Sequence, residues 1–130
     1  MEQRESDKTP IDLRVRTKQF ALRVIRLNRA LPRSMEAHVI GRQLLRSGTS
    51  VGANYREATR ARSQDEYASK LGVCLQELEE TTYWLELVVE AELVKIGRVQ
   101  GLFDEIDELL AIFVSLAKRA GSKQRVSGKS

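Results

Sequence analysis

Four segments of this 130-residue chain repeat apolar residues at alternating steps of three and four. This spacing places apolar side chains on one face of an α-helix, as in helices that pack side by side. Residues that disfavour helices are scarce, since the chain has 2 Pro and aromatic residues make up 5%. The sequence therefore predicts an all-α fold, an antiparallel up-down-up-down four-helix bundle. The expected helices cover residues 10–30, 35–61, 64–91 and 94–120.

The apolar stripes predict which side chains form the core. Hydrophobic residues make up 42% of the chain, enough for one core but not for two. The stripe of the first segment comprises Leu13, Thr17, Phe20, Val24, Leu27 and Leu31. The stripe of the last segment comprises Ile96, Val99, Phe103, Ile106, Leu110, Phe113 and Ala117.

Polar residues indicate where the helices begin. Thr9 is suited to the N-cap of the first helix, Pro10 to its first position and Asp12 to its third, as in a capping box. Ser34 and Ser63 are the N-cap candidates of the second and third helices. These positions predict short connections between neighbouring helices.

Two terminal segments fall outside the predicted bundle. Residues 1–9 are polar and of mixed charge, so we expect them to be disordered. Gly121 is suited to end the last helix, and residues 121–130 predict a flexible basic tail. The N-terminus has no apolar segment typical of a secretory signal, and no uncharged run approaches the ~20 residues that span a bilayer. We therefore expect a cytoplasmic protein with no membrane partner.

The apolar stripe of the second segment is unusually small and polar. Gly41, Gly48 and Gly52 lie together on one flank of it. Glycine inside a helix costs up to ~1 kcal/mol relative to alanine. Three of them on one flank predict either that a neighbouring helix packs closely there or that the helix bends near Gly48.

Residues with catalytic or metal-binding chemistry are few. With one Cys (Cys74) and one His (His38), the chain has none of the usual zinc-site spacings and no possible intrachain disulfide. Cys74 lies on an apolar stripe, where a buried, inert thiol is expected. The glycine-rich segment 48–52 lacks the Gly-Lys-Ser/Thr ending of a phosphate-binding loop. We therefore predict no catalytic residue, no metal and no cofactor, and a protein that is not an enzyme.

The net charge of +4 hides a strong segregation of charge. Residues 11–62 contain 12 basic and 3 acidic side chains, whereas residues 63–110 contain 3 basic and 12 acidic ones. Residues 111–130 add a further 5 basic side chains. One predicted helical hairpin is thus strongly basic and the other strongly acidic.

Arginines follow one line of the second helix, opposite its apolar stripe, and the first helix adds more on its non-core surface. Guanidinium groups make forked contacts with phosphates, so this surface is a candidate site for nucleic acid. The alternative is a solvated face whose arginines pair with the acidic helices, within a subunit or across a subunit boundary. Aromatic residues do not interleave with the arginines, so binding would depend on shape and charge more than on base stacking. The candidate nucleic-acid-binding residues are Arg23, Arg26, Arg42, Arg46, Arg56 and Arg60.

The third helix carries a second apolar patch, on a side away from its main stripe. It comprises Val73, Trp84, Leu87 and Ala91. A helix that is apolar on two sides needs two partners, and tryptophan is enriched in protein interfaces. The patch predicts a homo-oligomer interface, with burial against a neighbouring helix of the same chain as the alternative.

Two stretches of the sequence resemble a bacterial family of four-helix bundles. Residues 43–58 read QLLRSGTSVGANYREA, and residues 67–71 and 75–81 read YASKL and LQELEET. Together they resemble the 23S rRNA intervening-sequence proteins over nearly all of residues 11–120. Where many members have Asn-Ile-Ala-Glu-Gly, this chain has Asn54-Tyr55-Arg56-Glu57-Ala58, which keeps the Asn and Glu but lacks the Gly.

The resemblance implies a bundle that assembles into a ring, typically a homopentamer. The family is similar to accessory proteins of diversity-generating retroelements, which bind nucleic acid and a reverse transcriptase. The resemblance implies RNA or DNA, or a reverse-transcriptase-like protein, as a partner, and it implies no catalytic residue. Asn54 lies on the core stripe, where we expect a buried amide that fixes the register of the helices.

Overall fold

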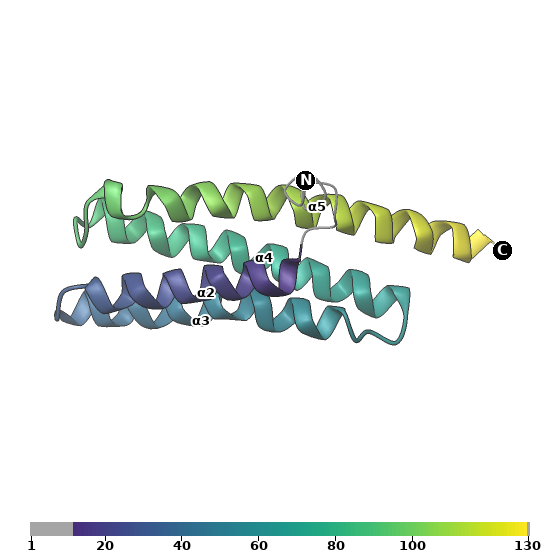
Figure 1. The fold of residues 1–130 in the computed structure, drawn as a ribbon, viewed down its shortest axis with the longest axis horizontal. Helices are drawn as coiled ribbons and strands as arrows, with labels where there is room; N and C mark the ends of the chain where they lie inside the picture. The colour runs from purple at the N-terminus through teal and green to yellow at the C-terminus, as the bar shows by residue number, and fades with distance from the viewer. Residues whose placement is uncertain (1–11, 130) are drawn as a thin grey trace, which may run out of the picture.

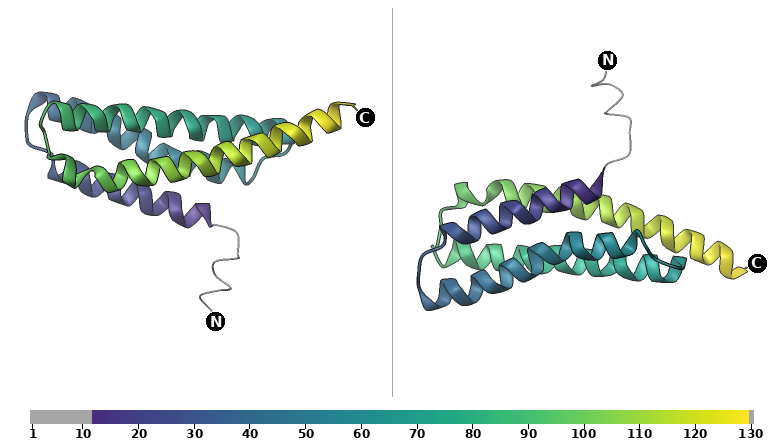
Figure 2. Two further views of the ribbon diagram at one scale, coloured as in Figure 1. Left: turned by 90° about the horizontal axis from the view of Figure 1, so that it is seen from above. Right: turned by 60° about the horizontal axis from the view of Figure 1, so that its bottom comes forward.

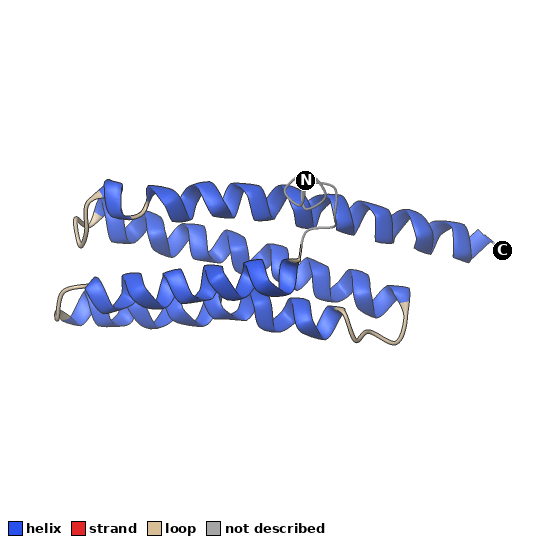
Figure 3. Cartoon of the chain, viewed as in Figure 1, coloured by secondary structure: helices blue, strands red, loops and turns tan. Residues whose placement is uncertain are grey.

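The computed structural model describes residues 12–129 of the chain, and the side chains of residues 12–121. Within these residues the structure is helical, with short loops and no strand (Figure 3). None of these helices is long and apolar enough to cross a membrane. The elements are α2 (Leu13–Ala30), α3 (Met35–Ala58), α4 (Gln64–Glu90), the short 3-10 helix η1 (Ile96–Arg98) and α5 (Gln100–Lys129).

Successive helices run in opposite directions, as the colour gradient of Figure 1 shows. The chain is therefore an up-down-up-down four-helix bundle, which confirms the predicted fold class. The helices differ in length, with 18, 24, 27 and 30 residues from α2 to α5. As a result, α2 begins well short of the end that α3 and α4 reach, and α5 projects beyond them (Figure 1). In the left view of Figure 2, α5 runs at an angle to α2, and these two helices separate along their length.

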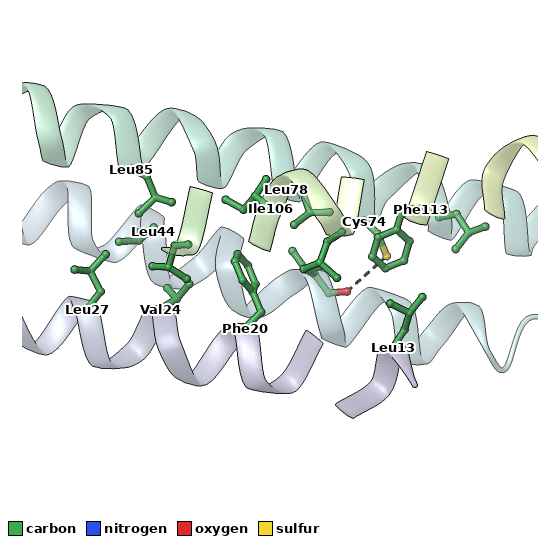
Figure 4. Packing of buried hydrophobic residues seen from close by; sticks show 14 of the residues in the cluster. Leu13, Phe20, Val24, Leu27, Leu44, Cys74, Leu78, Leu85, Ile106 and Phe113 are labelled. Carbon is green, nitrogen blue, oxygen red and sulfur yellow. Dashed lines mark hydrogen bonds between the residues drawn. The ribbon is translucent and has the colours of Figure 1, made fainter. Parts of the chain in front are cut away.

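The core is a continuous seam of large apolar side chains between the helices (Figure 4). Five of the six residues of the predicted α2 stripe are buried, and the sixth, Leu31, is the C-cap of α2 and is half-buried. In α5 the buried line differs from the predicted one, because Ile96 lies in η1 and is 48% exposed, while Phe103 and Leu110 are only half-buried. The line that α5 contributes comprises Leu102, Ile106, Leu109, Phe113 and Ala120, preceded by Val99.

The three glycines of α3 face α2 and let the two helices pack closely. A Cβ added at Gly48 would lie 2.9 Å from Cγ1 of Val24, and one at Gly52 would lie 2.9 Å from Oγ1 of Thr17. At Gly41 the added atom would lie 2.6 Å from the Asn28 amide nitrogen. The helix is continuous from Met35 to Ala58. The close-packing interpretation of the glycines is thus confirmed.

Several helix ends differ from the sequence-based expectation. Asp12 is itself the N-cap of α2, since its Oδ1 accepts hydrogen bonds from the backbone N–H groups of Arg14 (3.1 Å) and Val15 (3.3 Å). The expected cap Thr9, with Pro10 and the rest of residues 1–9, lies outside the described residues.

The predicted stop at Gly121 is wrong, because α5 continues through it to Lys129. None of the described glycines has a positive φ, so Gly121 does not form the left-handed turn that ends many helices. A single glycine lowers helix propensity by only ~1 kcal/mol, which a long helix tolerates. A tail separate from the helix therefore does not begin at residue 121. At its other end, α5 starts at Gln100, after η1, and not at residue 94.

Candidate nucleic-acid interface

The candidate arginines of α2 and α3 differ in how far they are free to meet a ligand. Arg42, Arg56, Arg60 and Arg26 are exposed, and Arg23 is half-buried. None of these five forms an ion pair with any residue between 12 and 121. Arg42 and Arg56 are 14 residues apart, which spans ~21 Å along a helix. The basic surface of the first hairpin therefore keeps most of its charge unpaired.

Arg46, in contrast, is directed toward the acidic helix α4. Its guanidinium pairs with Glu80 and, at 3.4 Å, with Glu77, and its Nε donates to the side chain of Gln43 at 3.0 Å. Sequence spacing placed Arg46 in line with the other arginines. Glu77 and Glu80 lie about one helical turn apart on α4, so both carboxylates can reach the same guanidinium group. Arg46 thus acts mainly as a link between α3 and α4.

A second link of this kind joins α2 to α5. The guanidinium of Arg16 forms a two-pronged contact with Glu105, with Nε–Oε2 at 2.8 Å and Nη2–Oε1 at 3.0 Å, and also meets Glu108. The hydrogen bond to Glu105 raises the pKa of Arg16 above its usual range. In a third link the acidic residue lies on α3 and the basic residue on α4. Nζ of Lys70 is 2.5 Å from Oε1 of Glu57, and this contact raises the pKa of Lys70.

These pairs settle part of the question that the charge pattern left open. The acidic hairpin does neutralise the basic one within a single chain, but among the described arginines of α2 and α3 it does so only at Arg16 and Arg46. Sequence reasoning missed the pairing of Arg16. Its signal is a pair of glutamates three residues apart on α5, which present carboxylates to the same side of the helix.

Three recesses lie beside the unpaired basic residues. The largest, about 450 Å³, is at the α2–α3 turn and includes Arg33, His38 and Arg42 in its lining. The second, about 340 Å³, lies between α2 and α3 and is flanked by Lys18 and Arg56. The third, about 240 Å³, is lined by Arg23, Arg26, Leu27, Arg98 and Leu102. Each recess of the basic hairpin thus offers at least two cationic side chains.

The second apolar patch of α4 is only partly exposed. Val73, Trp84 and Leu87 are half-buried, and Ala91 is exposed. The ring of Trp84 packs against the core, and its Nε1 donates to Oε2 of Glu80 at 3.0 Å. The chain itself therefore provides part of the contacts that the patch requires.

Tyr83 extends this patch, although sequence reasoning did not include it. It is 52% exposed and meets Trp84 edge to face, with ring centroids 4.9 Å apart. The residue was missed because its helical position lies almost opposite the main stripe of α4, at the edge of the second patch. Two adjacent aromatic rings on the outer side of the bundle make this the most prominent aromatic feature of the described surface.

Cys74 and Asn54 have structural surroundings. The thiol of Cys74 is fully buried, its Sγ lies 3.6 Å from the carbonyl oxygen of Val51 (Figure 4), and burial raises its pKa to about 12. The expectation of a buried thiol is confirmed. Asn54 is half-buried and donates to the carbonyl of Ser50 in its own helix at 2.9 Å, so it does not fix register between helices. No group of three or more His, Cys, Asp or Glu side chains suited to a metal ion occurs in the described part of the chain.

Comparison with known proteins identifies the family. The sequence profile of the 23S rRNA-intervening sequence proteins matches residues 11–115, most of the chain. The chain belongs to this family. A search among curated proteins found no match.

A solved structure with a similar fold supports this family assignment. It is a protein of unknown function from the S23 ribosomal protein family of Bacteroides thetaiotaomicron, and it superposes with a TM-score of 0.76. The two sequences are 34% identical, and the match covers 81% of this chain and 97% of that one. Family membership thus accounts for the fold. It does not by itself identify a ligand or a reaction.

Proposed function

We propose that this member of the 23S rRNA-intervening sequence family is a non-enzymatic, cytoplasmic protein that binds structured nucleic acid, in particular RNA, or a ribonucleoprotein partner. The observation that carries the proposal is the unpaired positive charge of α2 and α3. Arg26, Arg42, Arg56 and Arg60 are exposed and without a carboxylate partner among residues 12–121.

Phosphate contacts suit this surface better than base recognition does. One guanidinium group can donate two hydrogen bonds to the oxygens of a phosphate. Several arginines on adjacent helices can therefore contact successive phosphates of a nucleic-acid backbone. α2 and α3 themselves carry no exposed Phe, Tyr or Trp ring among their residues, since Phe20 is buried and Tyr55 is half-buried. Recognition would then depend on the shape of the folded nucleic acid and on charge.

The proposed assembly is a homo-oligomeric ring, with five subunits as the expectation from the family. Its subunit contacts would use the patch of Val73, Trp84, Leu87 and Ala91, together with the exposed Tyr83. An oligomer would repeat the basic surface and increase its effective affinity for a long polyanion. The alternative is a scaffold without nucleic acid, in which the remaining arginines pair with acidic helices of neighbouring subunits. The ion pairs of Arg16 and Arg46 within the chain are the observation that favours this alternative.

Titration of a labelled, structured RNA at several salt concentrations tests the nucleic-acid role. The variant Arg42→Glu/Arg56→Glu reverses two charges of the basic hairpin, and Lys118→Glu/Arg119→Glu reverses two exposed charges of α5 as a matched control. We expect the first variant to weaken binding strongly and to reduce the salt slope by about one per residue changed. The control should change both much less.

Equal losses in the two variants, or no loss in either, would rule out α2 and α3 as the binding surface. Light scattering of the same variants without RNA tests the scaffold alternative. If Arg42→Glu/Arg56→Glu dissociates the oligomer, these arginines serve subunit contacts and the scaffold account replaces the nucleic-acid account.

The variant Trp84→Glu tests the subunit contact. It places a charge in the apolar patch, so we expect the assembly to dissociate while helicity stays high. Met35→Glu is the control, because Met35 is an apolar residue that is 82% exposed on α3, outside the patch. A monomeric wild-type protein, or an assembly that withstands Trp84→Glu, would refute the proposed interface.

A further inference from the structure

The smallest of the three recesses combines arginines from both hairpins. Arg23 and Arg26 come from α2, whereas Arg98 comes from η1, in the otherwise acidic half of the chain. Leu27 and Leu102 complete the lining of a recess of about 240 Å³. Three arginines thus line one small recess at the junction of α2, η1 and α5.

No carboxylate within residues 12–121 forms an ion pair with these three arginines. The contrast with Arg16, two turns earlier on α2, is instructive, because two glutamates of α5 bind that residue. The first turn of α5 has no acidic residue, and Asp104 in its second turn accepts a hydrogen bond from Gln100 at 2.9 Å. The amino end of a helix carries partial positive charge, which adds to that of the arginines. The junction therefore holds an excess of positive charge that an anion would balance.

A glycine of α5 makes room for one of the three guanidinium groups. A Cβ added at Gly101 would lie 2.7 Å from Nη2 of Arg23. The side chain of Arg23 therefore extends from α2 onto the first turn of α5, and its guanidinium would have to move if residue 101 carried a Cβ. Gly97, one turn earlier in η1, has nothing within 4 Å of the equivalent position.

The size of the recess limits what it can hold. Pockets for whole small molecules usually measure about 300–1,000 Å³, so a space of about 240 Å³ is small for a nucleoside. A phosphate group is smaller, and its oxygens match the forked donors of arginine. Leu27 and Leu102 contribute no hydrogen-bond donor, so the three guanidinium groups supply the polar contacts from side chains.

We propose that Arg23, Arg26 and Arg98 form a phosphate-binding site at the α2–η1–α5 junction. The assignment of this phosphate to a nucleic acid rests on the proposed function, whereas the anion site itself does not. The phosphate is either an internal phosphodiester of the strand or a phosphate at its end, and these share the same chemistry. Arg98 and Gly101 are the residues that distinguish this site from a general basic surface.

Titration with inorganic phosphate at constant ionic strength tests the site, followed through the side-chain N–H signals of the arginines by NMR. In the wild-type protein the signals of Arg23, Arg26 and Arg98 should shift together and saturate. Removing one charge-assisted hydrogen-bonding group by Arg98→Gln should weaken phosphate binding about tenfold. Arg29→Gln removes the same charge from an exposed arginine of α2 outside the recess, and it should leave binding nearly unchanged.

Two glycine variants separate geometry from charge. Gly101→Ala should displace the guanidinium of Arg23 and weaken phosphate binding without loss of helicity, since the displaced atom is the end of a flexible side chain. Gly97→Ala should have no effect on binding. Absence of saturable phosphate shifts, or equal losses in Arg98→Gln and Arg29→Gln, would overturn the proposal.

The nucleic-acid arm uses one RNA hairpin in two forms, with and without a 5′-phosphate. If Arg98→Gln weakens both forms equally, the site takes an internal phosphate, and if it weakens only the phosphorylated form, the site takes the chain end. RNA binding that is unaffected by Arg98→Gln, combined with no phosphate binding, refutes the site and leaves the proposed function standing. Phosphate binding without any RNA binding refutes the proposed function and leaves the anion site standing.

Discussion

The two helical hairpins of this protein are built on different packing principles. In the α2–α3 hairpin, three glycines of α3 bring the backbones together, and the outer surface carries unpaired arginines. In the α4–α5 hairpin, large side chains such as Leu78 and Phe113 fill the interior, and the outer surface carries carboxylates. The first hairpin should therefore be sensitive to added atoms in its interface, and the second to removed ones.

The difference also explains how the opposite charges are used. Glu77 and Glu80 of α4 bind Arg46, and Glu105 and Glu108 of α5 bind Arg16. Because only these two arginines of the basic hairpin are neutralised within residues 12–121, the segregation of charge does more than connect the hairpins. It also leaves a basic surface that is not neutralised within these residues, as the proposed nucleic-acid role requires.

The largest loss of stability is expected when a buried side chain is removed from the acidic hairpin. Leu78 is fully buried, so Leu78→Ala should lower the free energy of unfolding by ~2–5 kcal/mol. Urea denaturation followed by circular dichroism measures this. A loss below ~1 kcal/mol would show that α4 and α5 do not depend on a tightly packed core.

Added volume in the basic hairpin is the next test. Gly48→Val should lower stability by ~1–3 kcal/mol, because even its Cβ would lie 2.9 Å from Cγ1 of the buried Val24. Gly72 of α4 is the matched control, since nothing lies within 4 Å of an added Cβ there. Gly72→Ala should raise stability by ~0.5–1 kcal/mol through helix propensity. Similar effects of the two changes would remove the distinction between the hairpins.

The ion pairs between the hairpins should contribute less. Arg16→Gln leaves Glu105, whose side chain is 16% exposed, without its partner, and should cost ~1–2 kcal/mol at neutral pH. Arg46 is 45% exposed, so Arg46→Gln should cost less than ~1 kcal/mol. The reverse order of the two losses would contradict the described burial.

The smallest effect concerns the thiol of Cys74. Its pKa is raised from 9.0 to about 12 by burial, so the folded thiol stays protonated while the unfolded one ionises above about pH 9. The native protein should therefore react with a thiol reagent no faster at pH 9.5 than at pH 7.5, and its stability should begin to fall above about pH 9. Cys74→Ala should lack this part of the decline. Fast modification of the native protein would contradict the buried position.

Sequence patterns were sufficient for the fold, and they limited the glycines of α3 to two alternatives, close packing or a bend near Gly48. The contacts of the glycines and the continuous helix decide for close packing. The patterns were only partly right for the buried line of α5. Val99, Ile106 and Phe113 are buried as predicted, but in the adjacent apolar pairs Leu102–Phe103 and Leu109–Leu110 the other member is the more buried one. Ile96 lies in η1, before α5 begins. No local pattern indicates that a long helix will pass through Gly121.

The candidate site was less predictable than the fold, because its residues meet only in three dimensions. Arg42 and Arg56 have no ion-pair partner among residues 12–121 and Arg46 is paired, although all three lie on the same side of α3. The difference depends on the glutamates of α4, whose position relative to α3 no helical wheel provides. Arg98 belongs to the acidic half of the sequence, and only the fold brings it beside Arg23.

The most direct test of the central claim is a map of the RNA contacts on the wild-type protein. Photo-cross-linking of a structured RNA, followed by mass spectrometry of the attached peptides, would locate them. We predict cross-links in α2 and α3 and none within α4, residues Gln64–Glu90. Cross-links concentrated in α4 would contradict a basic hairpin that binds nucleic acid. A cross-linking yield that does not fall as the salt concentration rises would contradict it as well.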